Sequence, residues 1–208
     1  MMYGARVSLA VALLPVAVAL AFGLPVGLIA GYAGGWSDAA AMRIADAMLS
    51  FPSILLAIAI MGTLGPGEQN VVIALAFAYA PAFARLVRGS ALAARRREFV
   101  IAAQAIGASD IRVILRHILP EVVAPLTVQA TASFATAIVA ESTLSFLGLG
   151  TQPPTPSWGA MLNEARSYLS DAPWFALVPA SAITLAVLSV NFLGDGLRDA
   201  LDPRRRRR

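Results

Sequence analysis

The sequence contains no cysteine and no lysine, since all sixteen of its basic residues are arginine. His117 is its single histidine. The missing cysteines exclude disulfides, thiolate metal sites and cysteine nucleophiles, and one histidine cannot build a multi-histidine metal site. No GxxxxGK[ST] phosphate loop is present, so we do not expect the chain to bind ATP by itself.

Charge is also scarce, at 13% of residues against 58% hydrophobic, with a mean hydropathy of +0.73. A soluble domain of 208 residues could not bury so much apolar surface, so the chain is an integral membrane protein. Apolar runs at residues 7–33, 48–64, 71–87, 122–149 and 175–193 predict about five membrane spans. We expect an all-α transmembrane bundle in a single domain, residues 1–208.

Three glycines in the first apolar run follow one another at intervals of four residues. Gly23, Gly27 and Gly31 would lie on one face of a helix and form a flat strip. Such strips let a second helix approach closely in a membrane. We therefore predict a packing role for this strip.

Residues 98–120, EFVIAAQAIGASDIRVILRHILP, form the one substantial polar segment between apolar runs. A first helix is predicted from Glu98 to about residue 106, closed by Gly107 in a left-handed conformation. Ser109 is expected to cap a second helix, with Asp110 at its positive end. Pro120 predicts a boundary or kink near residue 119. The second helix should carry one apolar stripe, made of Ile111, Ile114, Leu115 and Ile118.

Arginine placement predicts the orientation, because loop arginines are retained in the cytoplasm. Residues 85–116 carry seven arginines and residues 198–208 six more, so both segments should be cytoplasmic. Counting back through three spans puts residue 1 outside, although Arg6 weakly favours an inside start. Either a preceding span is absent from this chain or residues 48–64 cross incompletely, and we favour the absent span.

Glu141 is the ionisable residue best placed for a function within a span. Intramembrane carboxylates mark functional sites by default. The alternative is a structural role, in which Glu141 accepts hydrogen bonds from neighbours such as Ser142, Thr143 and Ser145. The sequence does not separate these two hypotheses.

The segment IAAQAIGASDIRVILRHILP resembles the EAA loop of the inner-membrane permeases of binding-protein-dependent ABC importers. Its matching positions are Ala102, Ala103, Gly107, Leu119 and Pro120. YGARVSL, GYAGGW, AESTLSFLGLGTQPPTPSWGAML and NFLGDGLRDALDPR resemble the dipeptide, oligopeptide and nickel branch, so the resemblance covers nearly the whole chain. In one departure, Ile101 stands where the family has a glutamate, while Glu98 lies one turn upstream.

This resemblance implies a permease subunit that couples to ATPase subunits through residues 98–120 and transports peptides or related small solutes. Its coupling residues are Glu98, Ile101, Ala102, Ala103, Gly107, Asp110 and Pro120. The implied partners are ABC ATPases, a second similar permease, an extracytoplasmic solute-binding protein and membrane lipid, with no nucleic acid. The implied location is the bacterial inner membrane. The resemblance implies no cofactor, no metal and no catalytic activity for the subunit. The alternatives are a secondary transporter, which would need inverted repeats and buried ion-coupling residues, and a structural subunit of a membrane complex.

Overall fold

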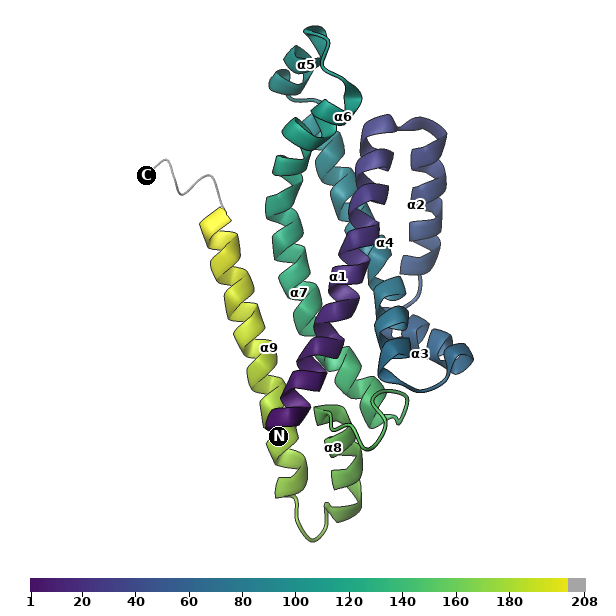
Figure 1. Cartoon of the computed structure of the whole chain (residues 1–208), viewed down its shortest axis with the longest axis vertical. Helices are drawn as coiled ribbons and strands as arrows, with labels where there is room; N and C mark the ends of the chain where they lie inside the picture. Colours follow the sequence, from purple (N-terminus) through teal and green to yellow (C-terminus); the bar gives the residue numbers. More distant parts are fainter. Residues whose placement is uncertain (202–208) are drawn as a thin grey trace.

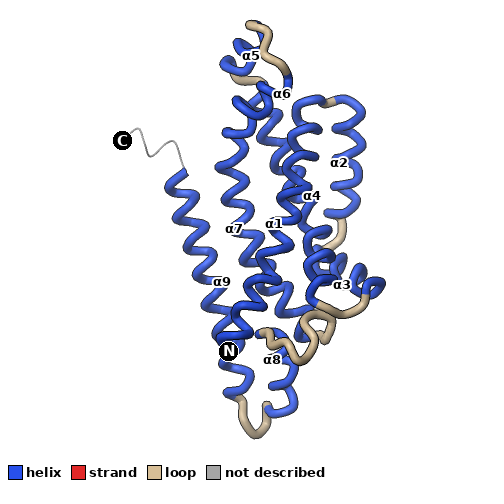
Figure 2. The backbone as a smooth tube through the Cα atoms, viewed as in Figure 1, coloured by secondary structure: helices blue, strands red, loops and turns tan. Residues whose placement is uncertain are grey.

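The structure is a computed structural model that describes residues 1–201. These residues form helices and connecting loops, with no strand among them, which confirms the all-α prediction (Figure 2). In chain order the elements are α1 (Met2–Ala33), α2 (Gly35–Leu49), α3 (Ser53–Leu64), α4 (Glu68–Arg95), α5 (Glu98–Ala105), α6 (Asp110–Val113), the π-helix η1 (Ile114–Ile118), α7 (Leu119–Phe146), α8 (Trp158–Ala165), the 3-10 helix η2 (Arg166–Tyr168) and α9 (Trp174–Leu201).

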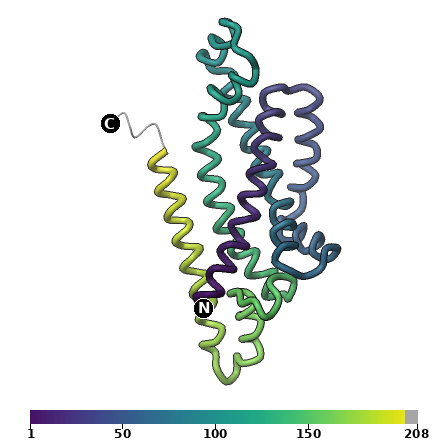
Figure 3. The backbone as a smooth tube through the Cα atoms, viewed as in Figure 1, coloured from purple at the N-terminus to yellow at the C-terminus, as the bar shows by residue number. Residues whose placement is uncertain are grey.

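Four long helical segments run along the long axis of the molecule (Figure 1). These segments, Met2–Ala33, Glu68–Arg95, Asp110–Phe146 and Trp174–Leu201, are long and apolar enough to cross a membrane. The short helices α5 and α6 stand together at one end, whereas α8 and the N-terminus lie at the other (Figures 1 and 3). We call residues 98–118 the hairpin, and the end of the molecule where they lie the hairpin end.

The region predicted as a span at residues 48–64 has a different structure. Helix α2 already begins at Gly35, and α3 starts only at Ser53, after a bend of 90° at the break between the two helices. Pro52 disfavours a helical conformation at Phe51, so α2 cannot continue into α3 and ends at Leu49. Twelve residues of α3 reach only about 18 Å, so residues 48–64 do not form a span by themselves. If α2 and α3 count jointly as one span, the total is five.

Helices α1 and α4 pack through the predicted glycine strip. A Cβ atom on Gly23 would lie 2.6 Å from Phe83 Cβ, and one on Gly31 would lie 2.8 Å from Ala91 Cβ. Such distances are too short for any real contact, so only glycine allows this approach. The predicted packing role is confirmed, and α1 and α4 make the most extensive contact of any two helices in residues 1–201.

The main core lies between α1, α4 and α7, where Phe83, Val87 and Ile138 are fully buried. A smaller cluster attaches α3 to α4 and includes the fully buried Met61 and Leu75. Helix α9 packs beside α7 and leaves most of its apolar side chains exposed (Figure 1).

Candidate functional site

The first helix of the hairpin closes as the sequence predicts. Helix α5 ends at Ala105, and Gly107 follows with φ +83°, in the left-handed region that glycine favours. The Gly107 amide donates to the Gln104 carbonyl at 3.0 Å, and the Ala108 amide donates to the Ala103 carbonyl at 3.1 Å. These bonds satisfy carbonyls that the helix end would leave free.

The start of α6 confirms one prediction and overturns another. Asp110 is its first residue, as expected, and the Asp110 carboxylate accepts a hydrogen bond from the Tyr32 hydroxyl. The Ser109 side chain makes no capping bond, so the predicted cap is wrong. Ser109 is exposed, so water can hydrogen-bond to the first amides of α6 in place of a side-chain cap.

The predicted apolar stripe splits into two halves. Ile118 is fully buried and Ile114 packs against the core, whereas Ile111 is 71% exposed and Leu115 is 58% exposed. The prediction of a single stripe is wrong because residues 114–118 form a π-helix, whose wider turn changes the side-chain period.

Pro120 explains the position of this π-turn. Proline has no N–H, so it cannot donate to the carbonyl of Arg116, and its ring clashes with that carbonyl in a regular α-helix. The wide turn just before Pro120 relieves this clash while the chain continues into α7. It also brings Val113 and Ile118, five residues apart, to the same buried face. The predicted boundary near residue 119 therefore takes the form of a π-turn without a break in the chain of helices.

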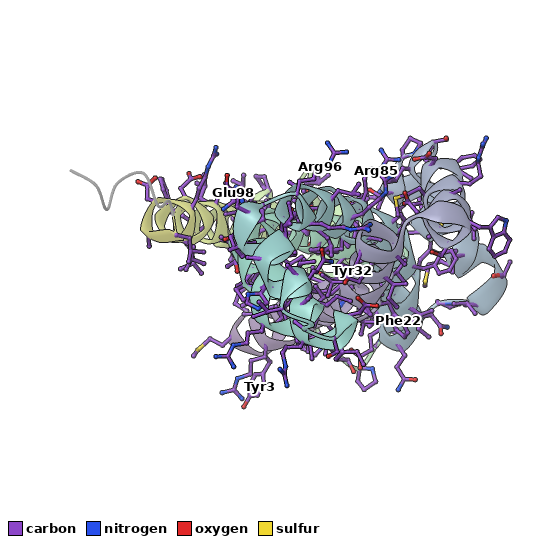
Figure 4. All side chains as sticks on the ribbon, turned by 90° about the horizontal axis from the view of Figure 1, so that it is seen from above. Tyr3, Phe22, Tyr32, Arg85, Arg96 and Glu98 are labelled. Atoms are coloured by element: carbon purple, nitrogen blue, oxygen red, sulfur yellow. The ribbon has the colours of Figure 1, made fainter. Side chains whose placement is uncertain are left out.

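The remaining predicted coupling residues divide between two faces. Ala103 is buried against the bundle, whereas Ile101 is 54% exposed and Ala102 is exposed. Glu98 is exposed at the first turn of α5, and viewed down the long axis it lies toward the side of α9 (Figure 4). Pro120 is also exposed. The hairpin thus presents Glu98, Ile101, Ala102 and Gly107 outward and uses Ala103 for packing.

Contacts that the sequence alone did not indicate hold the hairpin to the bundle. Tyr32 at the end of α1 donates to Asp110 and accepts from Gln104 Nε2 at 3.2 Å. Directly before the hairpin, Arg97 Nη1 lies 3.0 Å from Glu121 Oε2 in α7. The only available signal for Tyr32 was a polar aromatic residue just before a Gly–Gly pair at the end of a span.

Glu141 is fully buried in α7, near the end opposite the hairpin. Ser145 Oγ donates to its carboxylate at 2.8 Å and Ser142 Oγ at 3.4 Å, which confirms both as local partners. Thr143 was wrongly expected to join them, since its hydroxyl donates to a backbone carbonyl of its own helix at 2.8 Å. The Ser8 hydroxyl of α1 lies next to the same carboxylate.

The Glu141 cluster reaches a third helix through the same serine. The Trp158 amide at the start of α8 donates to Ser8 Oγ at 3.0 Å. Gly159 follows, and a Cβ atom there would overlap the Ser142 carbonyl. The buried carboxylate therefore lies where α1, α7 and α8 meet.

No group of three metal-ligating side chains comes together within residues 1–201. His117, the only histidine, lies beside Phe99, with 6.3 Å between the ring centroids. The described residues thus combine membrane-spanning helices, a hairpin at one end and a hydroxyl-lined carboxylate toward the other.

The long apolar helices define a polytopic membrane protein. Residues 23–207 match the family described as "binding-protein-dependent transport system inner membrane component", and the chain belongs to this family. It is therefore a multi-pass component of the bacterial inner membrane.

Two relatives refine the comparison. The dipeptide transport system permease protein DppC of Alkalihalophilus pseudofirmus is 53% identical over 202 residues, which cover 97% of this chain. The glutathione transport system permease protein GsiD of Escherichia coli is 52% identical over 201 residues, again 97% of this chain. The chain spans 66% of the length of each relative. These matches agree with the dipeptide, oligopeptide and nickel branch.

Solved structures share the fold at lower identity. A chain of the inward-facing MetNI methionine ABC transporter superposes with a TM-score of 0.75 at 21% identity, covering 97% of this chain and 96% of that one. A chain of an amino acid ABC transporter gives a TM-score of 0.72 at 15% identity, covering 93% of this chain and 90% of the other. These similarities show the fold of ABC importer permeases.

Proposed function

We propose that the chain works as a permease subunit of an ATP-driven importer and lines part of the pathway for peptides or related small solutes. The observation that carries this proposal is the hairpin, which stands at one end of the spans (Figure 1). Its apolar side chains are exposed there. Family membership supports the transport role, and the names of the two relatives support the solute class. In this proposal the chain has no catalysis of its own, and separate ATPase subunits hydrolyse ATP.

The hairpin end is cytoplasmic in this proposal. Seven arginines lie along α4, in its link to α5 and in the hairpin: Arg85, Arg88, Arg95, Arg96, Arg97, Arg112 and Arg116. Such arginines are retained on the cytoplasmic side. Helix α9 runs back from the opposite end toward this one (Figure 3), which supports a cytoplasmic C-terminus. Arg204 to Arg208, on which that prediction partly rests, lie outside the described residues.

An ATPase subunit is the partner that we infer for the hairpin. Its exposed apolar side chains are Phe99, Ile101, Ile106, Ile111 and Leu115. Ile106 is 87% exposed at the tip, beyond the spans. A cluster of this kind on a small projecting element indicates a protein partner, because water disfavours large exposed apolar patches.

Glu98 supplies the charge that Ile101 lacks, in our proposal. Both side chains are exposed, and residues three apart lie on one face of a helix. Within residues 1–201 the Glu98 carboxylate makes no ion pair, so it is available to a basic side chain of the partner. The contact would then be apolar at position 101 and ionic one turn earlier.

Further partners follow from the same proposal. The exposed apolar faces of α9 are available to a second, similar permease or to membrane lipid. The opposite end, with α8 and the loops around it, is the side on which an extracytoplasmic solute-binding protein would deliver the solute (Figure 1). For Glu141 we propose a structural role, because it is fully buried where α1, α7 and α8 meet and accepts hydrogen bonds from Ser142 and Ser145.

Substitution of Gly107 by valine tests the coupling role. At φ +83° a β-branched side chain is strained by roughly 1–2 kcal/mol, so the hairpin should change shape. In the complete transporter reconstituted in vesicles, we expect ATP hydrolysis to persist while solute uptake falls at least tenfold. Gly65→Val is the matched control, since Gly65 has φ +82° and lies at the opposite end, before α4.

Both glycines leave open space around a built Cβ atom, so the two variants introduce the same kind of strain. Unchanged uptake per ATP in Gly107→Val would contradict the coupling role of the hairpin. Uptake by the purified chain without ATPase subunits would instead support a secondary transporter.

A further inference from the structure

The last turn of α1 carries a tyrosine that contacts both helices of the hairpin. Tyr32 is only 9% exposed, and viewed down the long axis it lies in the middle of the bundle (Figure 4). Its hydroxyl donates to the Asp110 carboxylate in α6 and accepts from Gln104 Nε2 in α5 at 3.2 Å. One oxygen atom thus joins α1 to the whole hairpin.

The end of α4 holds the same tyrosine from another side. Arg95 Nη1 donates to the Tyr32 carbonyl at 2.6 Å, and the guanidinium lies 5.4 Å from the ring centroid. That carbonyl belongs to the last turn of α1, where helix carbonyls have no amide partner within the helix. A cation at this position is also favoured by the helix dipole and by the aromatic ring.

Within residues 1–201, every hydrogen bond between the hairpin and α1 runs through Tyr32. The preceding residue, Gly31, packs directly against α4. A displacement of the hairpin therefore acts on α1 at a point where α1 and α4 are already locked together.

We propose that Tyr32 is the residue through which the hairpin moves the α1–α4 pair when the transporter changes between an inward-facing and an outward-facing state. This inference rests on the proposed function and names the chain's own connection between the ATPase contact and the spans. Tyr32 is a positioning residue, since it acts through the hairpin and need not touch the ATPase or the solute. Packed helices that share such a contact pass on a rigid-body rotation without unfolding.

Tyr32→Phe tests the proposal, because it removes the hydroxyl and keeps the ring beside Arg95. The assay uses the complete transporter in vesicles, with radiolabelled dipeptide or glutathione delivered by the binding protein. We expect assembly with the ATPases and ATP hydrolysis to persist, while solute taken up per ATP hydrolysed falls about tenfold, in line with the loss of a hydrogen bond to a carboxylate. Tyr3→Phe is the matched control, because Tyr3 lies in the first turn of α1 and is 76% exposed, at the edge of the bundle in Figure 4.

A second variant keeps the test decisive if Tyr32→Phe folds poorly. Asp110→Asn weakens the same hydrogen bond from the hairpin side. If the two groups act as one unit, uptake per ATP in the double variant should be no lower than in the more severe single variant. Normal uptake per ATP in both single variants would overturn the proposal. Loss of ATPase binding by Tyr32→Phe would also overturn it, because Tyr32 would then be part of the docking surface. Failure of the unmodified complex to transport with ATP would refute the proposed function itself.

Discussion

The glycine strip between α1 and α4 makes a quantitative prediction for Gly27→Ala. A Cβ atom at position 27 would lie 2.5 Å from the Ala84 carbonyl oxygen and 2.6 Å from Val87 Cβ. Ordinary contact begins near 3.4 Å, so the helices would have to separate by about 0.9 Å (3.4 − 2.5). A gap of roughly 0.5–1 Å forfeits a quarter to a half of the dispersion attraction across it.

The expected cost follows from this geometry. Forcing one extra carbon into a packed interface costs about 1–3 kcal/mol. For a chain of this size each kcal/mol lowers the melting temperature by about 2–4 °C, so a fall of roughly 2–12 °C is expected. The measurement is thermal unfolding of the detergent-purified protein, followed by circular dichroism or tryptophan fluorescence.

Gly89→Ala provides the matched control within α4. A Cβ atom there meets nothing within 4 Å, so the melting temperature should stay the same or rise slightly. Alanine restricts the unfolded chain more than glycine does, which stabilises by about 0.4–1 kcal/mol where there is space. If Gly27→Ala were as stable as Gly89→Ala, the inference that the strip sets the approach of the two helices would be wrong.

Three further predictions concern stability and use the same unfolding measurement. Glu141→Leu should destabilise by about 1–3 kcal/mol, because the buried Ser145 hydroxyl loses its acceptor, whereas Glu141→Gln keeps one and should cost less. Two ion pairs join α2 to α4, Asp38 with Arg88 and Asp46 with Arg85. Asp38→Asn should destabilise more than Asp46→Asn, since the Asp38 side chain is 17% exposed and that of Asp46 is 60% exposed. Gly159→Ala should destabilise by about 1–3 kcal/mol, because its Cβ atom would overlap α7.

Each of these has an outcome that would contradict it. Equal stability of the leucine and glutamine variants at position 141 would mean that the carboxylate's hydrogen bonds do not stabilise the junction of three helices. Equal effects at positions 38 and 46 would mean that burial does not decide the strength of the α2–α4 ion pairs. For position 159 the control is Gly196→Ala, where a Cβ atom meets nothing within 4 Å, and similar stability of the two variants would refute the close approach of α8 to α7.

The features predicted correctly from the sequence depend on short stretches of chain. Gly107 closes a helix because only glycine takes its backbone conformation easily, and Gly23, Gly27 and Gly31 share a face because helical geometry places them there. The Glu141 partners Ser142 and Ser145 were predictable for the same reason, since they lie within one turn of the carboxylate.

The features that were missed depend on parts of the chain distant in sequence or on a local change of helix type. Nothing near Tyr32 indicates Asp110, which is 78 residues away. The single apolar stripe does not form because residues 111–118 do not keep one helical period, since Pro120 imposes a wider turn. Composition placed a span at residues 48–64, but the bend beside Pro52 divides that stretch between two helices.

The hairpin contains both kinds of feature, those set by neighbouring residues and those set by contacts with distant parts of the chain. Its buried side, with Val100, Ala103 and Val113, packs against the bundle, and Tyr32 adds polar bonds to the same side. Its exposed side carries the apolar residues that we assign to an ATPase. The hairpin consists of only two short helices, and its inner face is packed and hydrogen-bonded. It therefore moves as a rigid body when its outer face is displaced. Force applied at the exposed face must therefore reach α1 and α4, which is the property that a coupling element requires.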